Sequence, residues 1–211
     1  MRYFIFYLYG EKQIRKTKTK TNQMRNLIFA INTSLDGCCD HTKFYPDEEM
    51  MEYFTHLTRD ADTFLYGRKT YQLMVPYWPD VAKNPSGQND RKVDIEYARA
   101  FDAINKIIVF SQSLDSPEGN KTRIVRTDLH DEVLKLKQEQ GKNILTGGVT
   151  IPSQLAALGL IDEYRFVVHP IVTGEGRRLF EGINLQEKLQ LKLVESTVFK
   201  SGSVALRYLK Q

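Results

Sequence analysis

The sequence predicts an α/β domain with a mainly parallel mixed sheet and antiparallel strands at its C-terminal edge. From residue 26 to about residue 158, short apolar runs alternate with amphipathic segments, which indicates successive strand–helix–strand units. After Asp162 the chain has three long strand-like runs with turns between them and no helical pattern, which indicates antiparallel strands. We therefore expect one domain over residues 24–211, preceded by an extension at 1–23.

The elements before residue 90 follow from apolar spacing and from turn residues. NLIFAINT at 26–33 is a compact apolar run that predicts a buried strand, and SLDG ends it. Residues 47–59 place apolar side chains on one helical face and acids in the first turn, which predicts a helix. TFLYG predicts a second strand. A helix is expected from Arg68 until the two prolines of PYWP break it, and residues 80–90 are expected to form an exposed loop.

The later elements are predicted on the same grounds. In order, they are a helical stretch at 93–101, the strand IIVF, the segment TRIVRT, an amphipathic segment at 131–139, the strand NILT and a helix at 151–158. The three runs that follow Asp162 are YRFVVHPIV, LQLKLVESTVF and SVALRYL.

The net charge of +4 originates in the extension, where six residues are Lys or Arg and one is Glu. A nucleic-acid-binding protein gathers basic residues on a folded face, so we expect no nucleic-acid partner. The extension has its apolar stretch before its basic residues, the reverse of a secretory signal, and no apolar run is long enough to span a membrane. We expect no membrane partner, although docking of the extension on a membrane surface stays open as an alternative.

Cys38 and Cys39 are the two cysteines of the chain. Adjacent cysteines suit neither a disulfide framework nor a two-pair zinc site, and the four histidines are too scattered for a metal motif. We therefore expect a reducing, cytoplasmic setting and no metal. His169 in FVVHP is expected to be a structural histidine with satisfied hydrogen bonds.

Polar, glycine-bearing segments follow four of the predicted strands. They are SLDG at 34–37, GRKTY at 67–71, SQSL at 111–114 and TGGVT at 146–150. Ligands of open α/β sheets bind beyond the carboxyl ends of the strands, so the shared position of these segments predicts a ligand site.

TGGVT joins a strand to a helix, so its glycines would let backbone N–H groups at a helix N-terminus approach an anion such as a diphosphate. A strand-to-helix turn also needs glycine for shape alone, and that interpretation is equally open. In GRKTY, Arg68 could bind a phosphate with two hydrogen bonds, and Ser111 could reach the 2′-phosphate of an adenine ribose. A solvated arginine and an ordinary serine cap are the alternatives.

Asp36 ends the first strand, where a carboxylate could orient a substrate or relay a proton if burial raised its pKa. Asp-Gly is also a common turn pair, which is the structural alternative. Trp78, between Tyr77 and Pro79, is a candidate wall for a flat substrate pocket.

Taken in order, five segments resemble the dihydrofolate reductase superfamily and, within it, the branch of the riboflavin-biosynthesis reductase C-terminal domain. They are AINTSLDG, LYGRKTYQLMVPYWP, IIVFSQSL, ILTGGVTIPSQL and LIDEYRFVVHPIVTGEGRRLF. The resemblance covers about residues 24–210. It implies a three-layer α/β/α fold of the dihydrofolate reductase type, NADPH as the hydride donor, a small-molecule substrate and often a homodimer.

The resemblance also implies roles for individual residues. Gly67, Arg68 and Thr70 would bind cofactor phosphates, Ser111 would lie near the 2′-phosphate, and the backbone near Ala30 would meet the nicotinamide amide. Asp36 would face the substrate, and VTGEGRRLF would form a structural loop. The diphosphate would lie on the turn made by Thr146, Gly147, Gly148, Val149 and Thr150.

The activity that these observations predict is NADPH-dependent reduction of a small heterocyclic or ribosylaminopyrimidine-like substrate. CCDHTKF after SLDG departs from the riboflavin-pathway reductases, and Glu48, Glu49 and Glu52 do not clearly reproduce the acid of dihydrofolate reductases. The substrate therefore stays open, with pterin or dihydrofolate reduction as an alternative. A protein that binds NADPH without turnover is a further alternative.

Overall fold

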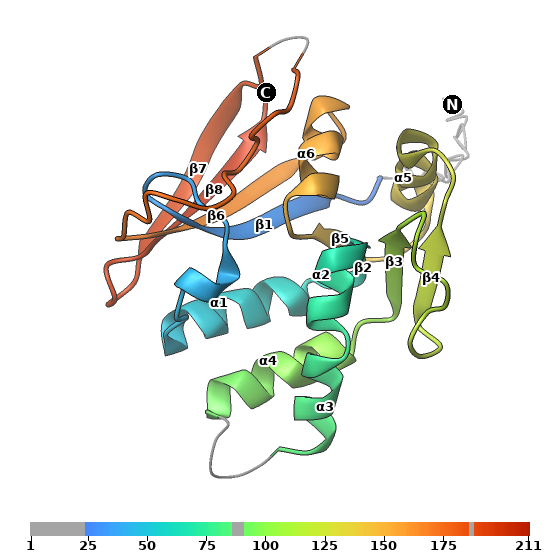
Figure 1. Cartoon of the computed structure of the whole chain (residues 1–211), viewed down its shortest axis with the longest axis horizontal. Helices are drawn as coiled ribbons and strands as arrows, with labels where there is room; N and C mark the ends of the chain where they lie inside the picture. Colours follow the sequence, from blue (N-terminus) through green and yellow to red (C-terminus); the bar gives the residue numbers. More distant parts are fainter. Residues whose placement is uncertain (1–23, 86–90, 186–187) are drawn as a thin grey trace, which may run out of the picture.

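The computed structural model describes residues 24–85, 91–185 and 188–211. Within them, eight strands form one sheet in the order β4-β3-β2-β5-β1-β6-β8-β7 (Figure 1). The strands are β1 (Leu27–Ser34), β2 (Ala61–Gly67), β3 (Lys106–Phe110), β4 (Thr122–Val125), β5 (Asn143–Thr146), β6 (Glu163–His169), β7 (Leu191–Val198) and β8 (Val204–Lys210). The six strands from β4 to β6 pair in parallel, while β8 pairs antiparallel with both β6 and β7. The predicted fold class is confirmed.

Helices cover both faces of the sheet (Figure 1). They are α1 (Glu48–Arg59), α2 (Arg68–Met74), α3 (Tyr77–Lys83), α4 (Lys92–Asp102), α5 (Leu129–Gln138) and α6 (Thr150–Ala157), with a short 3-10 turn at His41–Lys43. Side chains of α1, α2 and α4 pack with Ile28 and Phe64 on one face, whereas those of α5 and α6 pack with Leu27 and Phe29 on the other. The alternation of neighbouring β1 residues between the two cores is the period-2 pattern of a strand buried on both sides.

The two prolines of PYWP act differently from each other. Pro76 separates α2 from α3, as predicted. Pro79 lies inside the first turn of α3 and does not break it, because the N–H groups of a first turn have no intrahelical partner and none is lost. The expected loop over 80–90 is therefore helical up to Lys83, and residues 86–90 lie outside the described part.

The predicted extension at 1–23 also lies outside the described residues. Among the helices that are described, none combines the length and the apolar character needed to cross a membrane.

The sheet order brings the four polar strand ends together. β3, β2, β5 and β1 are neighbours and parallel, so their carboxyl ends lie along one edge of the sheet. The chain leaves β1 and β2 toward the face covered by α1 and α2, but it leaves β5 toward the opposite face, covered by α6. Ligands of open α/β sheets bind where neighbouring strands send their connections to opposite faces. We therefore expect a ligand at this position, between the ends of β2, β5 and β1, and refer to it as the crevice.

β1 extends past the end of β5. Its pairing with β5 stops at Phe29 and Thr146, whereas its pairing with β6 continues to Ser34 and His169. From Ala30 onward, the edge of β1 that faced β5 therefore has no strand partner among the described strands, and these residues border the crevice.

Candidate functional site

The Gly147–Gly148 turn lies directly against its neighbours in the crevice. A Cβ on Gly147 would lie 3.4 Å from the Ala30 carbonyl oxygen, and a Cβ on Gly148 would overlap Thr70 Oγ1. Gly148 also has φ +84°, a backbone conformation that residues with a side chain rarely adopt. A Cβ on Gly67 would come within 3.0 Å of Ile151 in α6. The start of α2 and the start of α6 are thus in contact, and the glycines make this possible.

The two helix N-termini form a positively polarised locus. Neither α2 nor α6 carries an acidic residue in its first turn, so the unpaired N–H groups there face no protein anion on their own helix. Arg68 is the first residue of α2, and its exposed guanidinium donates a 3.3 Å hydrogen bond to Gln72. These features suit a bound anion.

Ser111 follows β3, and because Gly67 pairs with Phe110 at the ends of β2 and β3, Arg68 and Ser111 each come directly after this last pair. The Ser111 hydroxyl accepts hydrogen bonds from the backbone N–H groups of Ser113 (3.2 Å) and Leu114 (3.0 Å). The serine thus caps its own turn, and its hydroxyl proton is left to donate to a ligand.

The side chain of Thr146 is already hydrogen-bonded within the protein, so it is not free for a ligand. The buried Thr146 hydroxyl donates to the Leu65 carbonyl at 2.7 Å, so the backbone is the part of Thr146 that a ligand could use.

Asn32 shares a β1 face with Ala30, and its side-chain oxygen is buried without a hydrogen-bond partner among the described residues. A buried carbonyl oxygen lacking a donor marks a place that a ligand could satisfy. Sequence reasoning passed over Asn32 because it reads as one residue of an apolar strand.

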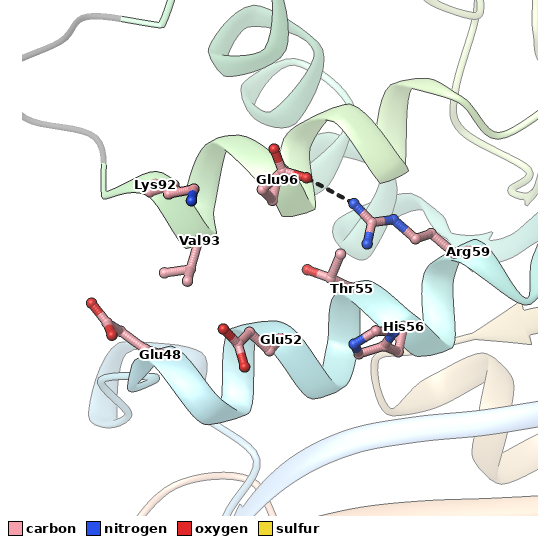
Figure 2. A pocket seen from close by; sticks show the side chains of 8 residues that line it. All are labelled: Glu48, Glu52, Thr55, His56, Arg59, Lys92, Val93 and Glu96. Atoms are coloured by element: carbon pink, nitrogen blue, oxygen red, sulfur yellow. Dashed lines mark hydrogen bonds and ion pairs between the residues drawn. The ribbon is translucent and has the colours of Figure 1, made fainter.

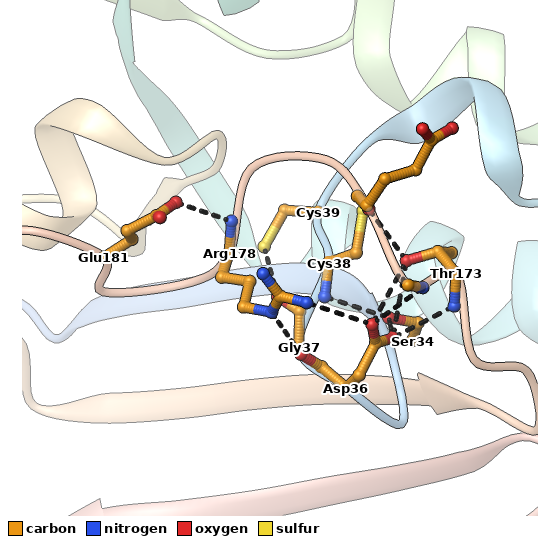
Figure 3. A network of polar contacts seen from close by, with 10 residues as sticks. Ser34, Asp36, Gly37, Cys38, Cys39, Thr173, Arg178 and Glu181 are labelled. Carbon is orange, nitrogen blue, oxygen red and sulfur yellow. Dashed lines mark hydrogen bonds and ion pairs between the residues drawn. The ribbon is translucent and has the colours of Figure 1, made fainter.

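The Asp36 carboxylate is held by donors from four residues (Figure 3). The Ser34 hydroxyl donates at 2.5 Å, the backbone N–H groups of Thr173 and Gly174 donate at 3.1 and 3.0 Å, and the Arg178 guanidinium lies at 3.4 Å. The Ser34 hydrogen bond, followed by that from Thr173, holds the pKa of Asp36 well below its ordinary value. The expected proton relay needed a raised pKa, so the structure favours the structural interpretation of Asp36.

Asp36 belongs to a longer contact between two loops. Residues 35–39 pair with residues 171–179 through backbone hydrogen bonds, of which Leu35 to Ile171 is 2.8 Å and Leu179 to Gly37 is 2.9 Å. The loop VTGEGRRLF is thereby fixed against the end of β1. Its Arg177 reaches the start of α6, where the guanidinium donates to Thr150 Oγ1 at 3.1 Å. Arg177 was missed because the sequence indicated only a structural loop there.

Trp78 packs between helices. Its ring lies edge-on against Tyr97 of α4 at 4.6 Å between centroids, and against Tyr77 at 4.9 Å. These contacts account for Trp78 as part of the core beside α3 and α4, so its role as a substrate wall stays a prediction.

His169 is buried and stacks on Phe44 with ring centroids 4.5 Å apart, and burial lowers its pKa. Its Nε2 has no hydrogen-bond partner in the described part of the chain. The expected structural position is therefore observed, but the expected full hydrogen bonding is not.

The acids of α1 point away from the crevice. Glu48 and Glu52 line a groove of about 570 Å³ between α1 and α4, together with His56, Arg59, Lys92 and Glu96 (Figure 2). Glu49 instead accepts the Lys200 backbone N–H at 2.7 Å and pairs with its ammonium at 2.9 Å. The groove therefore belongs to the packing of two charged helices, and the crevice is the stronger candidate site because four strand ends converge there.

The RibD C-terminal domain family matches residues 25–205, which is most of the chain. The chain belongs to this family. Among its relatives is the uncharacterized YyaP of Bacillus subtilis strain 168, 31% identical over 195 residues that cover 90% of this chain and 97% of YyaP.

Solved structures agree on the fold of this family member. A putative riboflavin biosynthesis protein from Shewanella sp. PV-4 superposes with a TM-score of 0.65 at 21% identity, covering 88% of this chain and 99% of that one. A dihydrofolate reductase from Enterococcus faecalis, solved with NADP(H) and RAB-propyl, superposes with a TM-score of 0.56 at 13% identity, covering 88% and 96% of the two chains. The family match confirms the riboflavin-biosynthesis reductase C-terminal branch, and the superpositions confirm the dihydrofolate-reductase-like fold.

We predict that Gly148→Ala lowers the free energy of unfolding by about 2–4 kcal/mol, because the new methyl group combines a left-handed backbone penalty with a clash. Gly119→Ala is the matched control, since Gly119 also has a positive φ (+72°) but nothing within 4 Å of a Cβ. Urea unfolding should show the larger loss for Gly148→Ala, with partial recovery on adding Thr70→Ala. Equal losses for the two glycines would show that the contact with Thr70 is unimportant.

We also predict that Asp36→Asn destabilises the protein in a pH-dependent way. A carboxyl whose folded pKa is depressed stabilises the fold above its unfolded pKa, near 3.8, and loses that contribution as the pH falls. The difference between wild type and Asp36→Asn should therefore be constant above about pH 5 and shrink below about pH 4, as measured by denaturant unfolding. A difference that stays the same at pH 3 and pH 7 would contradict the ionised network.

Proposed function

We propose that the chain is an NADPH-dependent reductase that transfers hydride to a small heterocyclic or ribosylaminopyrimidine-like substrate. The observation that carries the proposal is the meeting of two acid-free helix N-termini at the end of β5, beside Arg68 and bordered by β1. Membership of the RibD C-terminal domain family supports the same class of activity.

The residues of the crevice fit such a cofactor. The turn from Gly147 to Thr150 offers backbone N–H groups to a diphosphate, while Gly67, Arg68 and Thr70 border it from α2. Ser111 lies on the next strand end for a 2′-phosphate, and the Ala30 backbone faces the opposite end of the crevice for a nicotinamide amide. NADPH would supply the hydride, and the protein would supply its orientation against the substrate.

A second candidate is a protein that binds NADPH without turnover. It is favoured by the engagement of Asp36 with donors from four residues, which leaves that carboxylate no role as an acid at neutral pH. Steady NADPH oxidation with a panel of pterin, ribitylaminopyrimidine and quinone substrates would exclude it. The outward direction of Glu48 and Glu52 disfavours dihydrofolate itself as the natural substrate.

We predict that the protein binds NADPH at least tenfold more tightly than NADH, and that Arg68→Ala removes most of this preference. A guanidinium–phosphate pair is a strong, charge-assisted hydrogen bond, and NADH lacks the 2′-phosphate of NADPH. Calorimetric titration with both nucleotides measures the effect. Arg99→Ala, which removes an exposed arginine of α4, is the control for net charge. Equal affinities for NADPH and NADH before and after the substitution would count against the assignment.

We propose a homodimer formed through β7. This edge strand is exposed over seven of its eight residues, including Leu193, Val194 and Val198. A long open edge with exposed apolar side chains favours pairing with another strand, and a second copy supplies an identical one.

We predict that light scattering after size exclusion gives twice the mass of one chain, and that Leu193→Glu shifts the protein toward the monomer. Leu158→Glu is the control, because Leu158 is similarly exposed (46% against 48%) but follows α6. A wild-type monomer at high concentration would rule out the dimer.

We also propose a reducing, cytoplasmic setting. Cys38 and Cys39 are free thiols, and burial raises the pKa of Cys39 to about 12. A thiol with so high a pKa is not a reactive thiolate, and Cys38 is fully buried, so neither cysteine is assigned a catalytic role.

A further inference from the structure

We infer that Arg177 binds the cofactor diphosphate and that Asp36 is the positioning residue that keeps Arg177 at the crevice. The inference rests on the proposed function. It assigns a phosphate-binding side chain to a loop that sequence reasoning treated as purely structural.

Arg177 comes to the crevice from a distant part of the chain. Its guanidinium donates to the hydroxyl of Thr150, the first residue of α6, across 27 positions of sequence. Thr150 also closes the Gly147–Gly148 turn, whose backbone meets Thr70 and the Ala30 carbonyl. The guanidinium therefore lies at the edge of the space in which the diphosphate is expected.

The position is electrostatically unfavourable without an anion. A cation at a helix N-terminus meets the positive end of the helix dipole, and the first turn of α6 has no acidic residue to offset this. Arg177 forms no ion pair with any carboxylate in the described part of the chain, in contrast to its neighbour Arg178, which pairs with Asp36. A phosphate group placed among Arg177, Thr150 and the N–H groups of α6 would turn this repulsion into attraction.

The two adjacent arginines have different tasks because the loop is fixed between them. The Cys39 N–H donates to the Arg177 carbonyl at 2.9 Å, and Cys38 and Arg178 form an isolated β-bridge. The Arg178 guanidinium turns back to the Asp36 carbonyl at 3.1 Å and to its carboxylate at 3.4 Å. Arg178 is thus fixed on Asp36, whereas the side chain of the preceding Arg177 reaches α6.

Asp36 supplies most of the side-chain bonds that fix this loop. It accepts from the backbone of Thr173 and Gly174 as well as from Arg178, which ties both ends of the segment 173–178 to the end of β1 (Figure 3). Gly176 lies between these ties with φ +97°, so close to the Cys38 sulfur that a Cβ would come within 2.7 Å. The loop is therefore seated on the end of β1.

The test compares NADPH and NADH binding to Arg177→Ala by calorimetric titration, with Arg177→Lys and Arg99→Ala alongside. Because both nucleotides carry the diphosphate, Arg177→Ala should weaken both by a similar factor, about tenfold, the size expected for a lost charge-assisted hydrogen bond. Arg177→Lys should retain part of the affinity, and Arg99→Ala should leave both affinities unchanged. This pattern differs from that of Arg68→Ala, which should weaken NADPH binding more than NADH binding.

The positioning role of Asp36 is tested by a double-mutant cycle on NADH affinity. Asp36→Asn should weaken binding in the wild-type background and cause little further loss when Arg177 is already alanine. Additive losses would show that Asp36 acts independently of Arg177 and would overturn this part of the inference. If Asp36→Asn does not fold, Arg178→Gln replaces it in the same cycle, because it removes the guanidinium contacts with Asp36 but leaves the carboxylate and its backbone donors in place.

The outcomes separate the inference from the proposed function. If the wild type binds neither nucleotide, the proposed function fails. If the wild type binds NADPH and Arg177→Ala binds both nucleotides within about twofold of it, the proposed function stands and the inference is wrong. A loss confined to NADPH would place Arg177 at the 2′-phosphate and would equally overturn its assignment to the diphosphate.

Discussion

The close contact between the Gly147–Gly148 turn and Thr70 is the constraint on which the rest of the site depends. β5 lies between β2 and β1, yet the chain leaves it toward the opposite face of the sheet. Beside Thr70 the chain can make that turn only with a residue that lacks a side chain, which is Gly148. Because the turn stays close, the starts of α2 and α6 face one space, and β1 borders it.

The limits of several strands and helices could be predicted because they depend on the local sequence. An apolar run followed by glycine or another turn residue marks where β1, β2 and β5 end, and helical spacing marks α1 and α4. The order of the strands could not be predicted in the same way. The insertion of β5 between β1 and β2 depends on contacts between helices and strands that are far apart in the sequence. Pro79 shows that the same residue can end a helix or start one, depending on where the first turn begins.

The backbone part of the site was visible in the sequence, whereas the side-chain partnerships were not. Glycines at 147 and 148 indicate a close approach whatever lies opposite. An Asp-Gly pair looks the same whether its carboxylate meets a substrate or, as for Asp36, backbone N–H groups 137 and 138 residues further along the chain. The adjacent arginines 177 and 178 are equally uninformative until the loop is folded, since only then does one pair with Asp36 and the other reach Thr150.

The acids near β1 and α1 constrain the chemistry that the crevice could support. Asp36 is ionised and surrounded by donors, Asp40 and Asp47 cap the turns that they precede, and Glu48 and Glu52 line the outer groove. No carboxyl group of this segment is thus both neutral at pH 7 and directed at the crevice, so none is suited to donate a proton to a substrate there. Under the proposed function, the proton that accompanies hydride transfer would therefore come from outside this segment, from water or from the substrate itself.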